Sequence, residues 1–125
     1  MNRIAATMML ALLAGSVHAE ELVWIKDGNH AAVHELQAGK FVEVCANISP
    51  GERYRWKFEA SGKVNFDVHY HVGDLVGRPA AIENVREAAA VLEVRSKQDY
   101  CWTWQNRSKE PVKVSAEISK IANSM

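Results

Sequence analysis

The sequence predicts an all-β fold, an antiparallel β-sandwich of about seven to eight strands in a jelly-roll-like arrangement. Two stretches, residues 53–60 and 64–72, alternate apolar and polar side chains without interruption, and a period of two is typical of half-buried β-strands. Glycine, proline, asparagine and serine separate these stretches from shorter β-prone runs. Short strands with turn signals at this spacing favour a sandwich over alternating strands and helices.

Three strands are expected in the first part of the chain, and residues that favour turns follow each of them. The strands are Leu22–Lys26, Val33–Leu36 and Phe41–Ile48. The turns are Asp27-Gly28-Asn29, Ala38-Gly39 and Ser49-Pro50-Gly51.

The middle of the chain carries the strongest alternation. Between Arg53 and Ala60 the inward set is Tyr54, Trp56, Phe58 and Ala60, and the outward set is Arg53, Arg55, Lys57 and Glu59. The segment Ser61-Gly62-Lys63 then predicts a hairpin turn into a second strand, Val64–Val72.

The last part of the chain is expected to hold three more strands. Residues Pro79–Ala90 predict a helical turn before a strand at Val91–Arg95. The final strands are Tyr100–Gln105 and Val112–Ile118, separated by Asn106–Pro111.

The N-terminal segment 1–19 has the pattern of a cleavable signal peptide. Arg3 precedes a short apolar run, Ile4–Ala14, and Val17-His18-Ala19 is a cleavage site of the A-x-A type. The run is too short to cross a bilayer, which needs about 20 residues in a helix. We therefore expect a periplasmic or secreted bacterial protein with one domain over residues 20–125; the alternative for the segment is an ordinary N-terminal helix.

The composition argues against several classes of function. The 125 residues carry 15 basic and 15 acidic side chains, so the basic footprint of a nucleic-acid binder is missing. No later segment is apolar enough to span a membrane. No Gly-x-Ser-x-Gly elbow, Gly-rich phosphate loop or His-Glu-x-x-His sequence is present, and we expect no enzyme activity.

The two cysteines, Cys45 and Cys101, predict one disulfide in an oxidising compartment. Closing the loop between these two cysteines with a disulfide stabilises the folded state by on the order of 4 kcal/mol in the chain-entropy model. Two free thiols that bind a metal are the alternative. If Trp102 and Trp104 face the core, the alternation places both cysteines on outer faces.

These residues together resemble a known family. A cysteine in an early strand, Val64-Asn65-Phe66-Asp67-Val68 in a middle strand, and Tyr100-Cys101-Trp102 followed by Asn106 resemble the GOLD domain of secretory cargo receptors. The resemblance covers roughly Val33–Ile118 and implies a β-sandwich in which the early and late cysteines pair. The chain is also similar to small exported bacterial proteins with a His-Tyr-His-x-Gly plus Tyr-Cys-Trp pattern. The coiled coil, membrane helix and cytoplasmic tail of the receptors are not expected here, so their trafficking role is not implied.

The strand Val64–Val72 also carries the main candidate site. His69 and His71 lie two residues apart on its polar face, at a separation that lets two imidazoles converge on one copper or zinc ion. Asp67 is a third ligand or a partner that orients an imidazole. The alternative is that both histidines are solvated residues on a polar face.

Two further patterns are candidates of lesser weight. His30 and His34 have the i, i+4 spacing of two ligands on a helix, but their surroundings predict a strand. Trp102 and Trp104 are either core residues, because sandwich cores need large aromatics, or a ligand-stacking surface.

The sequence therefore predicts an exported, non-enzymatic binding module with a copper or zinc ion at His69 and His71. Its alternative is a GOLD-like protein-interaction module of the cell envelope that has no metal and binds another envelope protein. A small-molecule pocket beside Trp102 or Trp104 is a third hypothesis.

Overall fold

The computed structural model describes residues 21–122, so the predicted signal peptide over residues 1–19 lies outside the described residues. Seven strands make up the fold of these described residues. They are β1 (Glu21–Trp24), β2 (Asn29–Leu36), β3 (Phe41–Ile48), β4 (Arg53–Val72), β5 (Leu75–Glu93), β6 (Gln98–Gln105) and β7 (Val112–Lys120).

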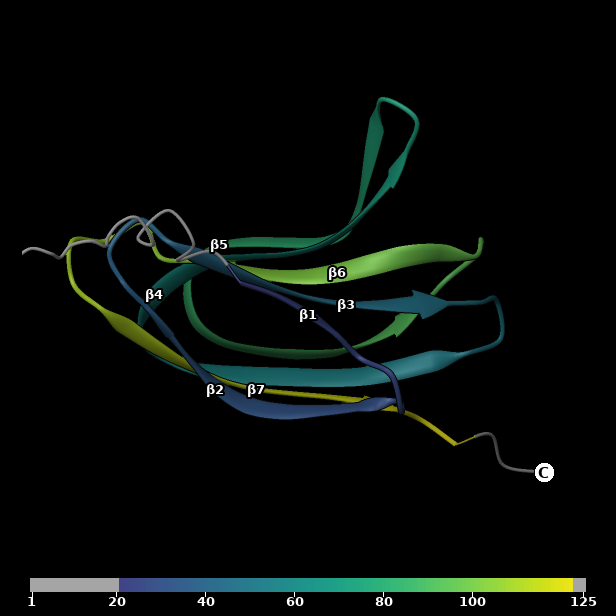
Figure 1. The fold of residues 1–125 in the computed structure, drawn as a ribbon, viewed down its shortest axis with the longest axis horizontal. Coiled ribbons are helices and arrows are strands. Elements are labelled where there is room, and N and C mark those ends of the chain that lie inside the picture. Colours follow the sequence, from purple (N-terminus) through teal and green to yellow (C-terminus); the bar gives the residue numbers. More distant parts are fainter. Residues whose placement is uncertain (1–20, 123–125) are drawn as a thin grey trace, which may run out of the picture.

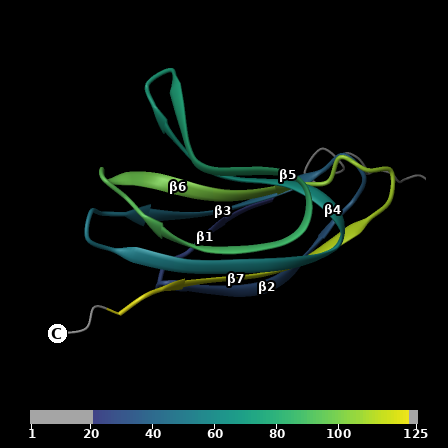
Figure 2. The same cartoon turned by 180° about the vertical axis from the view of Figure 1, so that it is seen from behind.

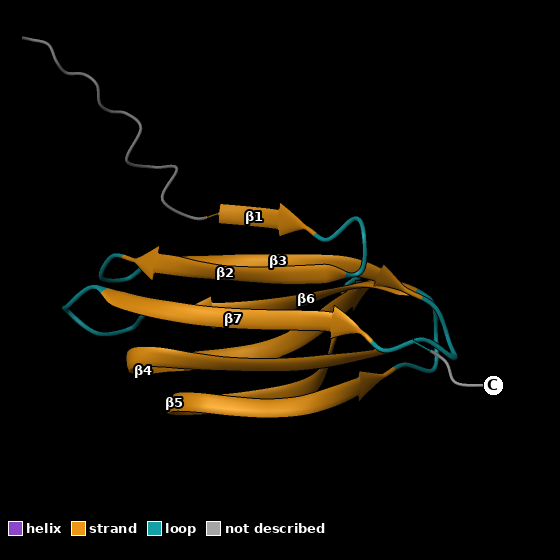
Figure 3. Ribbon diagram, turned by 90° about the horizontal axis from the view of Figure 1, so that it is seen from below, coloured by secondary structure: helices purple, strands orange, loops and turns teal. Residues whose placement is uncertain are grey.

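The strands form one curled sheet that packs against itself as two layers (Figure 1, Figure 3). The strand order is β1-β3-β6-β4-β7-β2, and β5 pairs with β4 along most of its length. The predicted all-β fold is confirmed. One strand departs from the antiparallel pattern, because β1 runs parallel to β3.

The long strands β4 and β5 join the two layers. The first part of β4 pairs with β7 and the second part pairs with β6, so β4 passes from one layer into the other as it bends (Figure 2). A strand that changes layers at a bend is a usual corner of an all-β sandwich.

The predicted hairpin turn at residues 61–63 is wrong, since β4 continues through it. Gly62 has no positive φ, and a Cβ atom there would lie 3.0 Å from a methyl carbon of Val112. Ser61 accepts a hydrogen bond from the Lys113 backbone N–H at 2.9 Å. The small residues therefore allow close packing at the layer crossing, where the sequence suggested a turn.

The predicted helical turn over Pro79–Ala90 is also wrong, because this stretch belongs to β5. Its alanines pair with β4, for example Ala88 with Phe58, and tertiary pairing here overrides the weak strand propensity of alanine. Residues 21–122 hold no helix with the length and hydropathy that a membrane crossing requires.

The core lies between the two layers and is dominated by aromatic rings. Trp104 of β6 meets Phe58 of the opposite layer edge to face, with ring centroids 5.7 Å apart. The ring centroids of Trp102 and Tyr54 are 5.9 Å apart across the layers, with the ring planes tilted by 53°. The alternation predicted for β4 is confirmed up to Val68, because Tyr54, Trp56, Phe58 and Phe66 are buried, whereas Val72 near the end of the strand is exposed.

Candidate functional site

The outer face of the layer formed by β1, β3, β6 and the second part of β4 gathers most of the predicted site residues. The register places these side chains in two neighbouring rows across the four strands. One row is Trp24, Cys45, Cys101 and His69, and the other is Leu22, Glu43, Thr103 and Asp67. Successive side chains of a strand point to opposite faces, so these residues, which alternate with the inward-facing residues of their strands, share the outer face.

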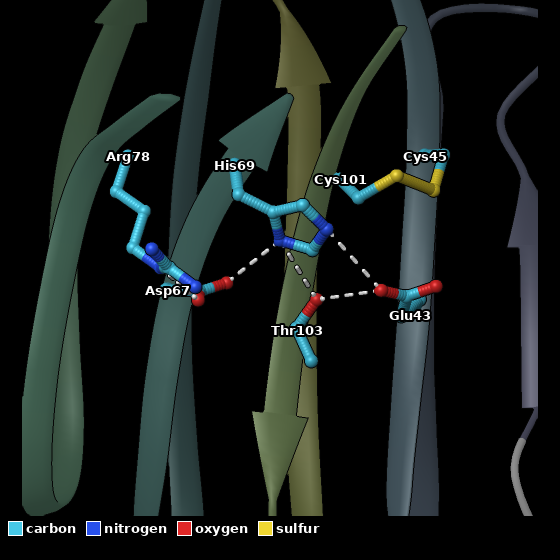
Figure 4. A network of polar contacts seen from close by, with 7 residues as sticks. All are labelled: Glu43, Cys45, Asp67, His69, Arg78, Cys101 and Thr103. Carbon is cyan, nitrogen blue, oxygen red and sulfur yellow. Dashed lines mark hydrogen bonds and ion pairs between the residues drawn. A yellow bond between two sulfur atoms is a disulfide. The ribbon is translucent and has the colours of Figure 1, made fainter. Parts of the chain in front are cut away.

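His69 is the centre of a polar network on this face (Figure 4). Its Nδ1 atom lies 2.9 Å from Oδ1 of Asp67, and its Nε2 atom lies 3.4 Å from Oε2 of Glu43. The Thr103 hydroxyl donates to the same Glu43 oxygen at 3.3 Å. The Arg78 Nε group donates to the other Asp67 oxygen, also at 3.3 Å. Both nitrogens of the ring therefore face carboxylates.

This arrangement favours the charged imidazolium. The hydrogen bond to Asp67 raises the pKa of His69 above its ordinary value, and the charges of Asp67 and Glu43 add to that effect. Partial burial lowers the pKa of His69 but does not cancel the rise. A ring held in this way has no free nitrogen to activate a nucleophile as a general base.

The predicted disulfide is confirmed beside this network. Cys45 and Cys101 are cross-strand neighbours joined through their sulfurs, on the side of the strands opposite the buried Trp102. Cys45 is nevertheless buried, with Trp24 of β1 as its neighbour in the register. Within the described part of the chain no cysteine is free.

The predicted metal ligands lie close together without converging. His71 meets His69 edge to face, with ring centroids 5.2 Å apart, while Asp67 and Glu43 occupy the nitrogens of His69. Among residues 21–122, the only three potential ligands that converge are Glu43 and the two cysteines, whose sulfurs the disulfide already uses. Copper or zinc at His69, His71 and Asp67 stays a prediction.

A groove of about 290 Å³ lies over the disulfide and reaches the histidines. Its walls include Leu22 and Trp24 from β1 and His71 from β4. A second groove of about 370 Å³ begins at Asp67 and Thr103 and extends towards Arg78 and Arg107. The His69 network therefore lies between two hollows of the same face.

Beyond His71, the β4–β5 hairpin projects away from both layers (Figure 1, Figure 2). Val72 and Leu75 pair across its tip, and the turn between them uses Gly73 at a positive φ of 60°. Tyr70 packs over Gly77 at the base, where any Cβ atom would collide with the tyrosine ring. The tip exposes Val72, Leu75 and Val76.

The other candidates lie inside the protein. Trp102 and Trp104 are completely buried, so the hypothesis of a ligand-stacking surface is wrong and the core alternative is correct. The exposed indole of the site is Trp24, at 44% exposure, which the sequence analysis did not single out. His30 and His34 both lie on β2, which begins at Asn29 where the sequence predicted a strand only from Val33, and His34 is buried.

Asn106 has a structural role that its sequence position did not reveal. It is completely buried, and its amide donates to the carbonyl oxygens of Leu36 and Glu110 at 3.0 and 2.7 Å. Its own side-chain oxygen accepts from the Ser108 backbone N–H and hydroxyl. Asn106 thereby ties the β6–β7 loop to the end of β2.

The chain is similar to known proteins in its structure but not in its sequence. No model of a known protein family matches the chain, and no curated protein is similar to it in sequence. Three solved structures of periplasmic inhibitors of g-type lysozyme, PliG, share its fold. The Aeromonas hydrophila protein superposes with a TM-score of 0.60 at 15% identity, over 82% of this chain and 97% of that one.

The two other inhibitors are more distant. A mutant of the Escherichia coli protein has a TM-score of 0.52 at 10% identity, over 82% of this chain and 100% of its own. The Salmonella Typhimurium protein has a TM-score of 0.50 at 9% identity, over 81% and 99%. The fold is shared. None of these comparisons confirms the resemblance to the GOLD domain.

Proposed function

We propose that this protein is a non-enzymatic, periplasmic protein-binding module that inhibits a lysozyme. The proposed contact surface is the outer face around His69 together with the tip of the β4–β5 hairpin. The leader predicted from the sequence would deliver the chain to the compartment named for the three inhibitors of the same fold.

The exposed apolar tip is the observation that carries this proposal. Leu75 is 73% exposed, and Val72 and Val76 are also exposed beside it. Exposed apolar side chains that are grouped and rimmed by polar residues mark protein-interaction surfaces. The rim is supplied by His71 and Arg78, which lie near the base of the same hairpin.

The groove beside the hairpin extends this surface towards β1. Trp24 and Leu22 are exposed on its far wall, and His71 lies on its near wall. Partly exposed tryptophan side chains are frequent anchors of protein interfaces because they bury a large area at little entropic cost. The two apolar groups are therefore positioned to contact one partner.

The geometry supports binding rather than chemistry. Asp67 and Thr103 both approach Nδ1 of His69, at 2.9 and 3.5 Å, and Nε2 faces Glu43. A catalytic triad needs its nucleophile and its acid on different nitrogens of the histidine. Thr103 therefore lacks the arrangement of an activated nucleophile.

A binding assay with purified proteins tests the proposal. The mature chain is mixed with a g-type lysozyme, and complex formation is followed by biolayer interferometry while inhibition is followed by lysis of bacterial cells. We expect a saturable complex and loss of lytic activity. A lack of both, for g-type lysozyme and for c-type and i-type lysozymes alike, would contradict the lysozyme proposal.

Two aspartate substitutions test the surface. Leu75→Asp at the tip should weaken binding at least tenfold, because a central apolar contact contributes about 2 kcal/mol. Val33→Asp is the matched control, since Val33 is 64% exposed on β2 in the other layer. Equal affinities of the two variants would exclude the hairpin tip as the contact.

A further inference from the structure

The second histidine pair lies where the curled sheet closes on itself. His30 and His34 belong to β2, at one end of the strand order, and Glu21 belongs to β1, at the other end. The Glu21 carboxylate lies 3.6 Å from Nδ1 of His34. This contact bridges the two ends of the strand order, with His34 itself buried.

The two imidazole rings meet nitrogen to nitrogen. Their Nε2 atoms are 3.0 Å apart, and their planes differ by only 7° with centroids 5.1 Å apart. The two Nε2 atoms are 5.1 − 3.0 = 2.1 Å closer together than the ring centroids, so each Nε2 atom lies on the edge of its ring that faces the other ring. The in-plane direction of each Nε2 atom therefore points at the other ring.

The surroundings of His30 disfavour its charged form. Burial, with the neighbouring His34 as a second cause, lowers the pKa of His30 below its ordinary value, although Glu21 acts in the opposite direction. The Glu21 carboxylate favours a proton on Nδ1 of His34, which leaves a lone pair on its Nε2 atom. A hydrogen bond at this distance needs a lone pair on one Nε2 atom and a proton on the other.

We infer that His30 and His34 bind a soft monovalent cation, with Cu(I) as the biological example, between their Nε2 atoms. Two nitrogens on opposite sides of an ion, each at about 2 Å, lie roughly 4 Å apart. The two Nε2 atoms, now 3.0 Å apart, reach this spacing if the ring of His30, which is only partly buried, moves away by about 1 Å. The Nε2 proton of His30 moves to its Nδ1 atom, so binding leaves the number of bound protons unchanged.

The rest of the site suits this ion better than a divalent one. The ring of His34 lies against Trp104, with centroids 6.4 Å apart and planes at 19°, so an aromatic wall covers one side. Among residues 21–122 no third ligand converges with the two imidazoles. A two-coordinate site is sufficient for Cu(I), whereas zinc sites usually have four ligands. Glu21 then orients His34 from outside the metal.

A competition experiment with two matched variants tests the site. The oxidised full chain is titrated anaerobically with Cu(I) against a chromogenic chelator, and with Ag(I) as a redox-inert probe. We expect one ion per chain, quenching of tryptophan fluorescence through Trp104, and changes in the imidazole resonances of His30 and His34. His30→Gln should abolish binding, while His69→Gln/His71→Gln should leave it unchanged.

Glu21→Gln should weaken Cu(I) binding about 10- to 100-fold without abolishing it, because this is the usual effect of losing a group that orients a metal ligand. The His30→Gln protein must keep the wild-type circular dichroism spectrum, which shows that it has folded. Binding that survives in folded His30→Gln, or that is lost in His69→Gln/His71→Gln, would overturn the inference. None of these outcomes depends on lysozyme binding.

Discussion

The two histidine pairs of this protein have similar sequence patterns and opposite environments. His69 and His71 lie on an outer face, where two carboxylates raise the pKa of His69 and so favour its charged form. His30 and His34 turn inward, where His34 lies against Trp104 and burial lowers the pKa of His30. The comparison teaches that the neighbours across the sheet decide what a histidine pair can do, since they set its charge and the direction of its lone pairs.

The largest expected effect comes from the disulfide, which borders only the outer pair. Cys45→Ala/Cys101→Ala should lower the free energy of unfolding by about 4 kcal/mol, because the cross-link restricts the unfolded chain. The imidazole resonances of His69 should shift, while those of His30 and His34 should not. Chemical denaturation and NMR spectra measure the two effects, and equal shifts in both pairs would contradict their independence.

The next effect separates a buried from an exposed histidine. His34→Ala should cost about 2–3 kcal/mol, because it leaves the His30 donor unpaired and opens space beside Trp104. His71→Ala should change the stability by less than about 0.5 kcal/mol, since its side chain is exposed. Urea denaturation of both variants checks the difference, and comparable losses would mean that the outer pair also supports the fold.

The smallest effect is a pH dependence of opposite sign in the two pairs. The pKa of His69 is raised on folding, so its contribution is present at acid pH and is lost as the pH rises above about 6.5 through the folded value. The pKa of His30 is lowered, so the unfolded chain takes up the proton first and stability is lost as the pH falls below about 6.5.

Two variants resolve these contributions. Asp67→Asn removes the main cause of the raised pKa of His69, and it should flatten the stability change between pH 6.5 and 8.5. His30→Gln should flatten the change between pH 6.5 and 5 instead. Denaturation midpoints measured from pH 5 to 8.5 provide the test. If Asp67→Asn flattened the change below pH 6.5, or His30→Gln the change above it, the assignment of each pH range to its histidine would be wrong.

Much of the fold could be predicted from local patterns. The alternation in β4 identified its buried aromatics, and the same alternation placed both cysteines away from Trp102. The errors occurred at Ser61–Lys63 and in β5, where small residues have more than one use. Gly62 allows close packing on Val112, and the alanines of β5 pair along β4, so in both places a long-range contact outweighs the local preference.

The candidate site could be predicted only in part. His69, Asp67 and the disulfide were recognised, because strand periodicity alone puts them on an outer face. Glu43 and Arg78 were missed, since they come from other strands and no spacing in the sequence marks them. Trp24 was missed because β1 pairs in parallel with β3, a neighbour that a short terminal run does not indicate.

The sequence by itself determined which side of each alternating strand faces the core, since the pleat fixes the direction of successive side chains. Only the tertiary structure decided which strands lie side by side, and so which charges meet each ring. Those contacts join residues far apart in the chain: Glu43 with His69 across β6, and Glu21 with His34 across the closing edge of the sheet. A pKa or a pair of facing lone pairs depends on such neighbours at a few ångströms, and local periodicity carries no information about them.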